Sequence, residues 1–209
     1  MSATPAQHLI DAVATVVEAA RVRSDLPDIS RAADELERLR PAPVGSGSCP
    51  AKVTELLDAA RLPDDPSLAR LAEALRHAAP YLGWFDAYPD HDELRDLREG
   101  YFVTTLVGHP RWPDALGEGT DASVFLTVQG PGLLYPRHSH LAPELYCAVA
   151  GTALWLQGDG PFEAKAPGSW MVHPPWTSHA MQTLDEPLIA LAVWTDDLDA
   201  PALLDEPVT

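Results

Sequence analysis

The chain has few cysteines, few basic residues and no long hydrophobic run, and each shortage excludes a class of protein. The two cysteines, Cys49 and Cys147, can form neither a disulfide framework nor a four-cysteine zinc site. No apolar stretch approaches the roughly 20 residues that a membrane-spanning helix needs. The N-terminus lacks the basic start and apolar core of a secretion signal. We therefore expect a soluble, cytoplasmic protein.

The shortage of basic residues argues against polyanionic partners. The sequence has 14 Lys and Arg residues against 31 Asp and Glu residues, a formal net charge of −17. Residues 101–209 hold only three of the basic residues, Arg111, Arg137 and Lys165. A surface of this sign repels phosphate backbones and anionic headgroups. We expect neither nucleic acid nor a membrane as a partner.

Hydrophobic periodicity divides the chain into two regions. In the first 100 residues, apolar side chains recur at spacings of three and four, which predicts helices over 5–23, 30–40, 51–61 and 67–79. Thr4 before Pro5 is typical of a helix start, and Ser30 is a candidate cap for the second helix. The segment 41–50 is rich in Pro, Gly and Ser, which indicates a linker or loop.

From residue 101 onward the pattern favours strands. Short runs rich in β-branched and aromatic residues end in Gly or Pro turns and cover 101–108, 123–130, 144–151, 152–158 and 187–194. Strands at this close spacing predict an antiparallel sandwich or barrel. We expect an α+β protein in which a helical region, 1–100, packs on a β region, 101–209, because the apolar helix stripes need a partner surface.

Histidines in the β region indicate a metal site. His138 and His140 are two residues apart, so on a strand both rings project to the same face and can bind one ion. Glu144 adds a carboxylate, although Pro143 predicts a bend before it. His179 could supply a fourth ligand from a later segment. Imidazole and carboxylate donors together suit zinc, iron, nickel, manganese or copper.

The spacing of these ligands resembles the first cupin motif. Gly132 is followed after five residues by His138, Ser139 and His140, and then after three residues by Glu144. A further six residues lead to Gly151, so every fixed position of the motif is matched. The resemblance implies a double-stranded β-helix, or jelly roll, with a metal inside the barrel.

The second cupin motif is matched in part. Gly168, Pro174 and His179 occupy its glycine, proline and histidine positions, whereas Trp176 and Thr183 stand where the motif has glycine and asparagine. We therefore expect Trp176 to change the turn below His179 and to lie near the pocket. His173 could approach the same site, but we interpret it as a packing residue.

Two tyrosines are candidates for a general base. If the residues after Glu144 form a strand, Tyr146 shares the face of Glu144, while Leu145 and Cys147 face away. A phenol beside a divalent ion loses its proton well below its usual pKa of about 10 and can then act as a base. Tyr135 is the second candidate. Both could instead be packing residues with a hydrogen-bonded hydroxyl.

Three segments together resemble the cupin-type dimethylsulfoniopropionate (DMSP) lyases of the short bacterial DddQ type. They are YPRHSHLAPELYCAVAGTALW, PGSWMVHPPWTSHAMQT and EPLIALAVW, and the similarity covers residues 80–197. The resemblance implies β-elimination of DMSP to dimethyl sulfide and acrylate. It also implies one divalent transition metal ion (zinc, iron, manganese or nickel), with tyrosines at the metal and the ligands His138, His140, Glu144 and His179.

The resemblance also directs attention to the aromatic residues. The sulfonium group of DMSP is a soft cation, which suits aromatic faces. We expect Trp155, Trp176 and Trp194 to contact the substrate, with Trp170, Tyr81, Trp84, Phe85 and Tyr88 as further candidates. We favour Tyr146 over Tyr135 as the base.

Two other functions fit the same residues. One is a lyase-like cupin enzyme that acts on another small carboxylate, as an isomerase or a dioxygenase. The other is a non-enzymatic cupin that binds a small molecule. Because cupins often pair through sheet faces, a homodimer is a further expectation.

Overall fold

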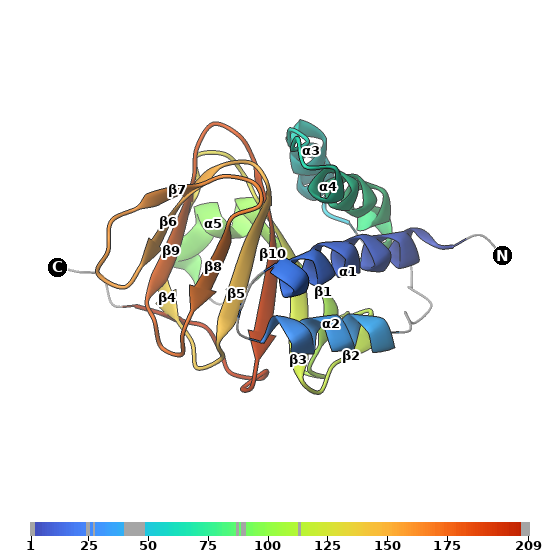
Figure 1. Cartoon of the computed structure of the whole chain (residues 1–209). Coiled ribbons are helices and arrows are strands. Elements are labelled where there is room, and N and C mark those ends of the chain that lie inside the picture. Colours follow the sequence, from blue (N-terminus) through green and yellow to red (C-terminus); the bar gives the residue numbers. More distant parts are fainter. Residues whose placement is uncertain are drawn as a thin grey trace.

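The computed structural model describes residues 3–23, 26, 28–39, 49–86, 88, 91–112 and 114–205. Helices come first and strands follow, and the change falls between Gly100 and Tyr101 (Figure 1). Most of the predicted linker, 41–48, lies outside the described residues. Within the described part, no helix is long and apolar enough to cross a membrane.

The four predicted helices are present, together with a short fifth one. They are α1 (Pro5–Arg23), α2 (Ile29–Arg38), α3 (Ala51–Ala59), α4 (Pro66–Ala78) and α5 (Arg95–Gly100). Thr4 precedes α1 as predicted, and its Oγ1 accepts the backbone N–H of Gln7 at 3.2 Å. Ser30 does not cap α2, because that helix already begins at Ile29 and Asp28 stands at the cap position.

The strands form two sheets. They are β1 (Tyr101–Gly108), β2 (Gly117–Glu118), β3 (Ala122–Gln129), β4 (Leu134–Ser139), β5 (Glu144–Ala150), β6 (Ala153–Gln157), β7 (Glu163–Lys165), β8 (Trp170–His173), β9 (His179–Thr183), β10 (Leu188–Thr195) and β11 (Leu203–Leu204). One sheet has the order β2-β1-β3-β10-β5-β8 and the other β11-β4-β9-β6-β7. Apart from the parallel β1–β2 pair, neighbouring strands are antiparallel, as expected for a jelly roll.

The central strands of the six-stranded sheet are buried on both faces. Every residue of β3, β5 and β10 is buried, because the helices cover one face and the barrel interior lies behind the other (Figure 1). In β5, Leu145 and Cys147 belong to the hydrophobic cluster shared with the helices, whereas Tyr146 belongs to the interior cluster. The predicted alternation is confirmed. The helices and the sheet share one hydrophobic cluster. The division into domains at residue 100 remains a prediction.

The motif glycines hold tight turns. Gly132, Gly151 and Gly168 all have positive φ angles, of 68°, 83° and 89°. At Gly151, between β5 and β6, an added Cβ would lie 2.2 Å from the carbonyl oxygen of Pro187. Only glycine combines this backbone conformation with so close an approach.

Candidate metal centre and adjoining cavity

Three histidines meet where β4 and β9 pair. His138 on β4 and His179 on β9 are direct partners in this antiparallel pair, so their rings lie on the same side. His140 follows directly after the end of β4. All three are buried, and one ring nitrogen of each lies within 4.8 Å of the others.

Glu144 completes the group from the opposite sheet. It begins β5 after a bend, as Pro143 predicted. One carboxylate oxygen, Oε2, lies 3.2 Å from Nε2 of His140 and 3.1 Å from Nε2 of His179. The other, Oε1, accepts the indole N–H of Trp194 at 2.6 Å. The carboxylate is therefore fixed between the imidazoles.

Backbone carbonyls set the tautomer of all three histidines. The Nδ1–H groups donate to the carbonyl oxygens of the residues at 136, 142 and 177, at 2.9, 2.8 and 2.8 Å. A carbonyl oxygen can only accept, so Nδ1 carries a proton, and Nε2 is the nitrogen that can offer a lone pair to a cation when the ring is neutral. This outer hydrogen bond is typical of metal-binding histidines. With a carboxylate among the donors, the group fits a divalent transition metal ion.

The charge of Glu144 dominates the electrostatics of the centre. Burial alone would raise the pKa of Glu144, but His140 and His179 outweigh it and hold that pKa well below its usual value. Burial lowers the pKa of His140, but the Glu144 charge and hydrogen bond outweigh it, and the net shift is upward. Burial also keeps the pKa of His138 well below 6.5. The Glu144 carboxylate therefore stays ionised among the imidazoles, which suits a cation.

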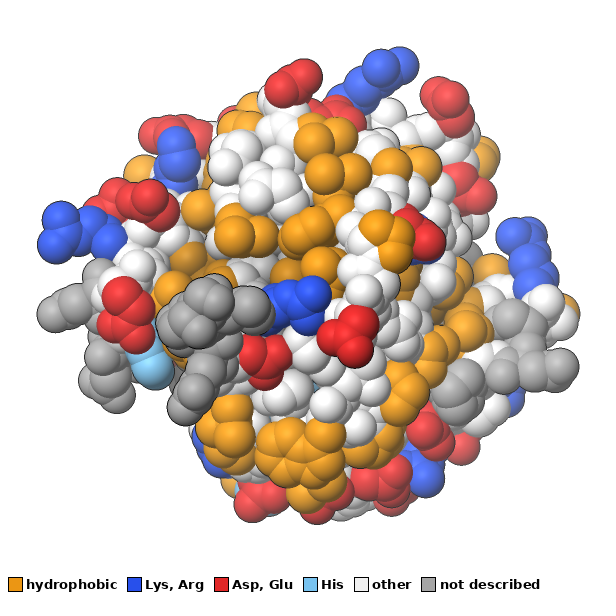
Figure 2. Space-filling view, turned by 90° about the vertical axis from the view of Figure 1, so that its left-hand side faces the viewer, with side chains coloured by type: hydrophobic (Ala, Val, Ile, Leu, Met, Phe, Trp, Pro, Cys, Tyr) orange, Lys and Arg blue, Asp and Glu red, His pale blue; other side chains and the backbone are white. Residues whose placement is uncertain are grey.

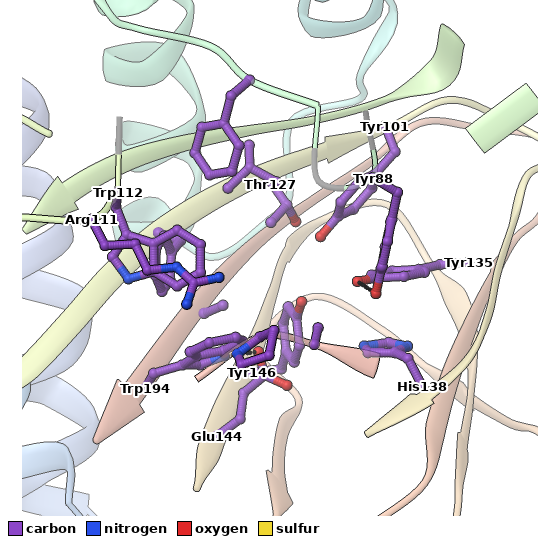
Figure 3. Close-up of a pocket in the computed structure, with 16 residues that line it drawn as sticks. Tyr88, Tyr101, Arg111, Trp112, Thr127, Tyr135, His138, Glu144, Tyr146 and Trp194 are labelled. Carbon is purple, nitrogen blue, oxygen red and sulfur yellow. Dashed lines mark hydrogen bonds between the residues drawn. The ribbon is translucent and has the colours of Figure 1, made fainter. Parts of the chain in front are cut away.

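A cavity of about 140 Å³ opens beside this group (Figure 3). Of the predicted site residues, Tyr135, His138, Glu144, Tyr146 and Trp194 line it. Its further walls are largely aromatic and apolar and come from Phe85, Tyr88, Tyr101, Val103, Arg111, Trp112, Phe125, Thr127, Ala192, Pro201 and Ala202.

Both candidate bases are buried at this cavity. The ring of Tyr135 stacks on His138 with centroids 4.0 Å apart, and its hydroxyl shares a 2.9 Å hydrogen bond with that of Tyr88. Tyr146 lies two residues after Glu144 on β5, and its hydroxyl lies near that of Tyr101. Burial raises the pKa of Tyr135 and of Tyr146 well above 10. Without a cation beside them, both phenols are therefore protonated.

The three predicted substrate tryptophans have different positions. Trp194 lines the cavity, and its ring lies 4.3 Å from that of His140. Trp155 is buried with its ring 5.0 Å from Tyr146, but it is not among the lining residues. The structure does not bring Trp176 to the cavity, since this residue is 54% exposed.

The expected change in the turn below His179 is not observed. Trp176 adopts a φ of 58°, the left-handed conformation that favours the motif glycine, and its N–H donates to the carbonyl oxygen of His140 at 2.8 Å. Thr183, at the motif asparagine position, has a clear role. Its hydroxyl donates to the carbonyl oxygen of Gly130 at 2.6 Å and accepts the N–H of Leu133 at 2.8 Å, which ties the turn before β4 to β9.

Sequence reasoning missed several residues that line the cavity. Phe125 and Thr127 are two residues apart on β3 and share one face of that strand, and Tyr101 begins β1. Whether these side chains point into the barrel depends on the register of the sheet. Arg111 and Trp112 lie in the loop after β1. Tyr88 was noted only as part of an aromatic group. It reaches the cavity because the chain before it pairs with β1 through Phe85 and Val103.

Comparison with known proteins identifies the family. The model of the dimethylsulfoniopropionate lyase family matches residues 7–190. The chain belongs to the DMSP lyase family. Its membership makes it a carbon–sulfur lyase, as the resemblance had implied.

Individual relatives support this membership. The DMSP lyase DddQ of Ruegeria pomeroyi is 28% identical over 165 residues, which span 76% of this chain and 79% of the relative. The DMSP lyase DddY of Shewanella woodyi is 33% identical over 105 residues, 43% of this chain but only 25% of that longer protein.

Solved structures agree over nearly the whole chain. A crystal structure from work on the DMSP lyases RdDddP and RnDddQII has a TM-score of 0.78 and 26% identity, and the match covers 97% of this chain and 98% of that one. The crystal structure of DddQ from Ruegeria pomeroyi has the same TM-score and coverage at 23% identity, which shows a shared fold.

Proposed function

We propose that this DMSP lyase family member cleaves DMSP to dimethyl sulfide and acrylate. His138, His140, Glu144 and His179 would hold one divalent transition metal ion, and a tyrosine would act as general base. The observation that carries the proposal is the buried donor group in the wall of an aromatic cavity. Its histidines are already fixed in the metal-binding tautomer by carbonyl groups.

The reaction needs a base, an electrophile and an apolar wall. The bound ion would supply positive charge that stabilises the negative charge developing at the substrate carboxylate. The tyrosine takes the α-proton, and the electron pair of that C–H bond forms the carbon–carbon double bond. The carbon–sulfur bond breaks, and sulfur keeps its electron pair and leaves as neutral dimethyl sulfide. Trp112, Phe125 and Trp194 provide aromatic faces for the sulfonium.

We propose Tyr146 as the base, with Tyr135 as the second candidate. Tyr146 lies on the same strand face as Glu144, so its phenol would be close to the bound ion, whose positive charge would lower the pKa of the phenol. The hydroxyl of Tyr101 is available to stabilise the phenolate. Tyr135 has the equivalent partner in Tyr88, at 2.9 Å.

The proposal includes a homodimer formed through the five-stranded sheet. Hydrophobic side chains gather on this side of the molecule (Figure 2). Its strands and connecting loops carry large exposed hydrophobic residues, namely Leu134, Phe162, Trp176, Leu184 and Leu203. Light scattering coupled to gel filtration tests this, and a monomer at micromolar concentration would contradict it.

The decisive experiment is gas-phase detection of dimethyl sulfide from purified protein and DMSP. Metal-free protein is reconstituted separately with zinc, iron, manganese and nickel. We expect release only from a metal-loaded form, and the most active form indicates the native metal. The variant His140→Ala should lose both the metal, measured by elemental analysis, and turnover. If no form releases dimethyl sulfide, the alternative of another small carboxylate substrate takes its place, and a metabolite screen would test it.

A further inference from the structure

A fourth imidazole lies in the metal centre, and the proposed function does not use it. His173 ends β8 and is the cross-strand partner of Glu144 in the antiparallel β5–β8 pair. Side chains at such positions lie next to each other on one face of the sheet. His173 is only 1% exposed. One ligand atom each of Glu144, His173 and His179 lie within 4.8 Å of one another.

The ring of His173 has no polar partner to explain its burial. Neither Nδ1 nor Nε2 makes a hydrogen bond within the part of the chain that the structure describes. The other three histidines of the centre each donate Nδ1–H to a carbonyl oxygen. Buried polar atoms are nearly always paired, because an unpaired one costs free energy. Two unpaired nitrogens in one ring point to a ligand that binds there in the working protein.

The surroundings of His173 favour a cation as that ligand. Its ring stacks on His179 with centroids 4.1 Å apart and an angle of 9°, and the ring of Tyr146 lies 6.1 Å away. The Glu144 carboxylate is its cross-strand neighbour. A neutral imidazole beside a carboxylate and a second imidazole offers a lone pair to a divalent ion.

We propose that His173 is a fifth ligand of the same metal ion. It adds its donor atom to those of His138, His140, Glu144 and His179. The inference rests on the proposed function, in that the centre must bind a divalent ion. Two nearly parallel stacked rings cannot both direct lone pairs at one point. The His173 ring therefore turns about its Cβ–Cγ bond on binding, and no hydrogen bond of the ring opposes this. Five protein donors suit five- or six-coordinate ions better than the tetrahedral zinc of structural sites.

Cobalt binding to the metal-free protein tests the proposal without turnover. Wild type and His173→Phe are titrated with Co²⁺ and followed by visible absorption. Phenylalanine keeps a ring against His179 but has no donor atom. We expect the Co²⁺ dissociation constant to rise roughly 100-fold. Losing an outer hydrogen-bond partner of a metal ligand already costs up to about this much, and losing a direct ligand should cost at least as much. The visible bands should intensify as the ion changes from five to four ligands. His77→Phe makes the same substitution at an exposed histidine of α4 and should change neither quantity.

The outcomes separate the two proposals. If wild type binds Co²⁺ and His173→Phe has the same affinity and spectrum, the fifth ligand is overturned and the metal centre stands. If wild type binds no Co²⁺, the proposed function fails and the inference fails with it. If circular dichroism shows that His173→Phe does not fold, pulsed EPR of Cu²⁺ bound to wild type decides by counting coordinated imidazoles. Four support the proposal, and three overturn it.

Discussion

The imidazoles of His138, His140 and His179 are each held at two points, by a backbone carbonyl at one edge and by an aromatic ring on one face. Tyr135 stacks on His138, Trp194 lies over His140, and His173 stacks on His179. The carbonyl fixes the tautomer and the ring contact fixes the plane. Such preorganisation lets these three histidines bind a metal without being ordered first.

The first prediction concerns the base. Tyr146→Phe should lower kcat by about 100-fold or more, the scale of general base catalysis, while the metal content stays at the wild-type level. Tyr135→Phe should also lose most turnover, because its hydroxyl shares the cavity. The measurements are kcat and solvent deuterium exchange at the substrate α-carbon. Near-normal turnover in both variants would remove the tyrosine mechanism and leave Glu144 or a metal-bound hydroxide as the base.

The second prediction concerns the pH dependence of the stability of the metal-free protein. Burial lowers the pKa of His138 well below 6.5 and that of His173 to about 3. Below pH 6.5 the unfolded chain therefore binds protons that the folded state excludes, and stability is lost as the pH falls. The raised pKa of His140 makes a contribution to stability of the opposite sign, but this single group acts against both His138 and His173. We expect the Tm to fall from pH 7 to pH 5.

The contribution of His173 can be isolated in the same experiment. At pH 5 it amounts to about 2 kcal/mol, so the Tm of His173→Phe should depend less steeply on pH than that of wild type. A Tm that stays constant over this range in wild type would contradict the neutral, buried state of these rings.

At the scale of secondary structure, the helices and the barrel depend on each other. The faces of β3, β5 and β10 that pack on the helices are hydrophobic, so without the helices these faces would be exposed. A polar contact fixes the docking of α2. The buried carboxylate of Glu35 accepts the backbone N–H groups of Thr120 and Asp121 at 2.8 and 2.7 Å, just before β3. Burial would raise the pKa of Glu35, but these donors lower it, and it stays ionised.

The third prediction follows from this contact. Glu35→Ala should lower the free energy of unfolding by about 2–3 kcal/mol, because it leaves two partly buried N–H groups without their charged acceptor. Urea denaturation measures the effect. Glu73→Ala, at an exposed position of α4, is the control and should change stability by less than about 0.5 kcal/mol. Equal effects in the two variants would show that α2 does not depend on this contact.

At the scale of the whole molecule, the net charge of −17 attracts the sulfonium of DMSP but repels its carboxylate. Arg111 is the one lysine or arginine among the described lining residues, and its guanidinium points into the cavity in Figure 3. It lies 5.3 Å from the ring centroid of Trp112 and donates to the carbonyl oxygen of Asp199. These contacts hold a positive charge at the cavity.

The fourth prediction tests this role. Arg111→Met should lower kcat/KM for DMSP about tenfold at low salt, mainly through KM, because the charge assists substrate capture rather than proton transfer. Added salt should shrink the difference. Lys165→Met removes one of the other two basic residues of the β region, on β7 and outside the cavity, and should have little effect. The assigned role is wrong if both variants behave alike.

The amino-acid sequence by itself determined the helices, the main strands, the cupin frame and the spacing of the histidines and Glu144. These features are local, because hydrophobic period, turn glycines and ligand spacing are all read along the chain. Only the tertiary structure decided which distant residues join them. Tyr88 reaches the cavity through the pairing of Phe85 with β1, and Arg111 through a loop. His173 faces the centre because β8 pairs with β5 in one register, and a shift by one residue would turn it to the opposite face.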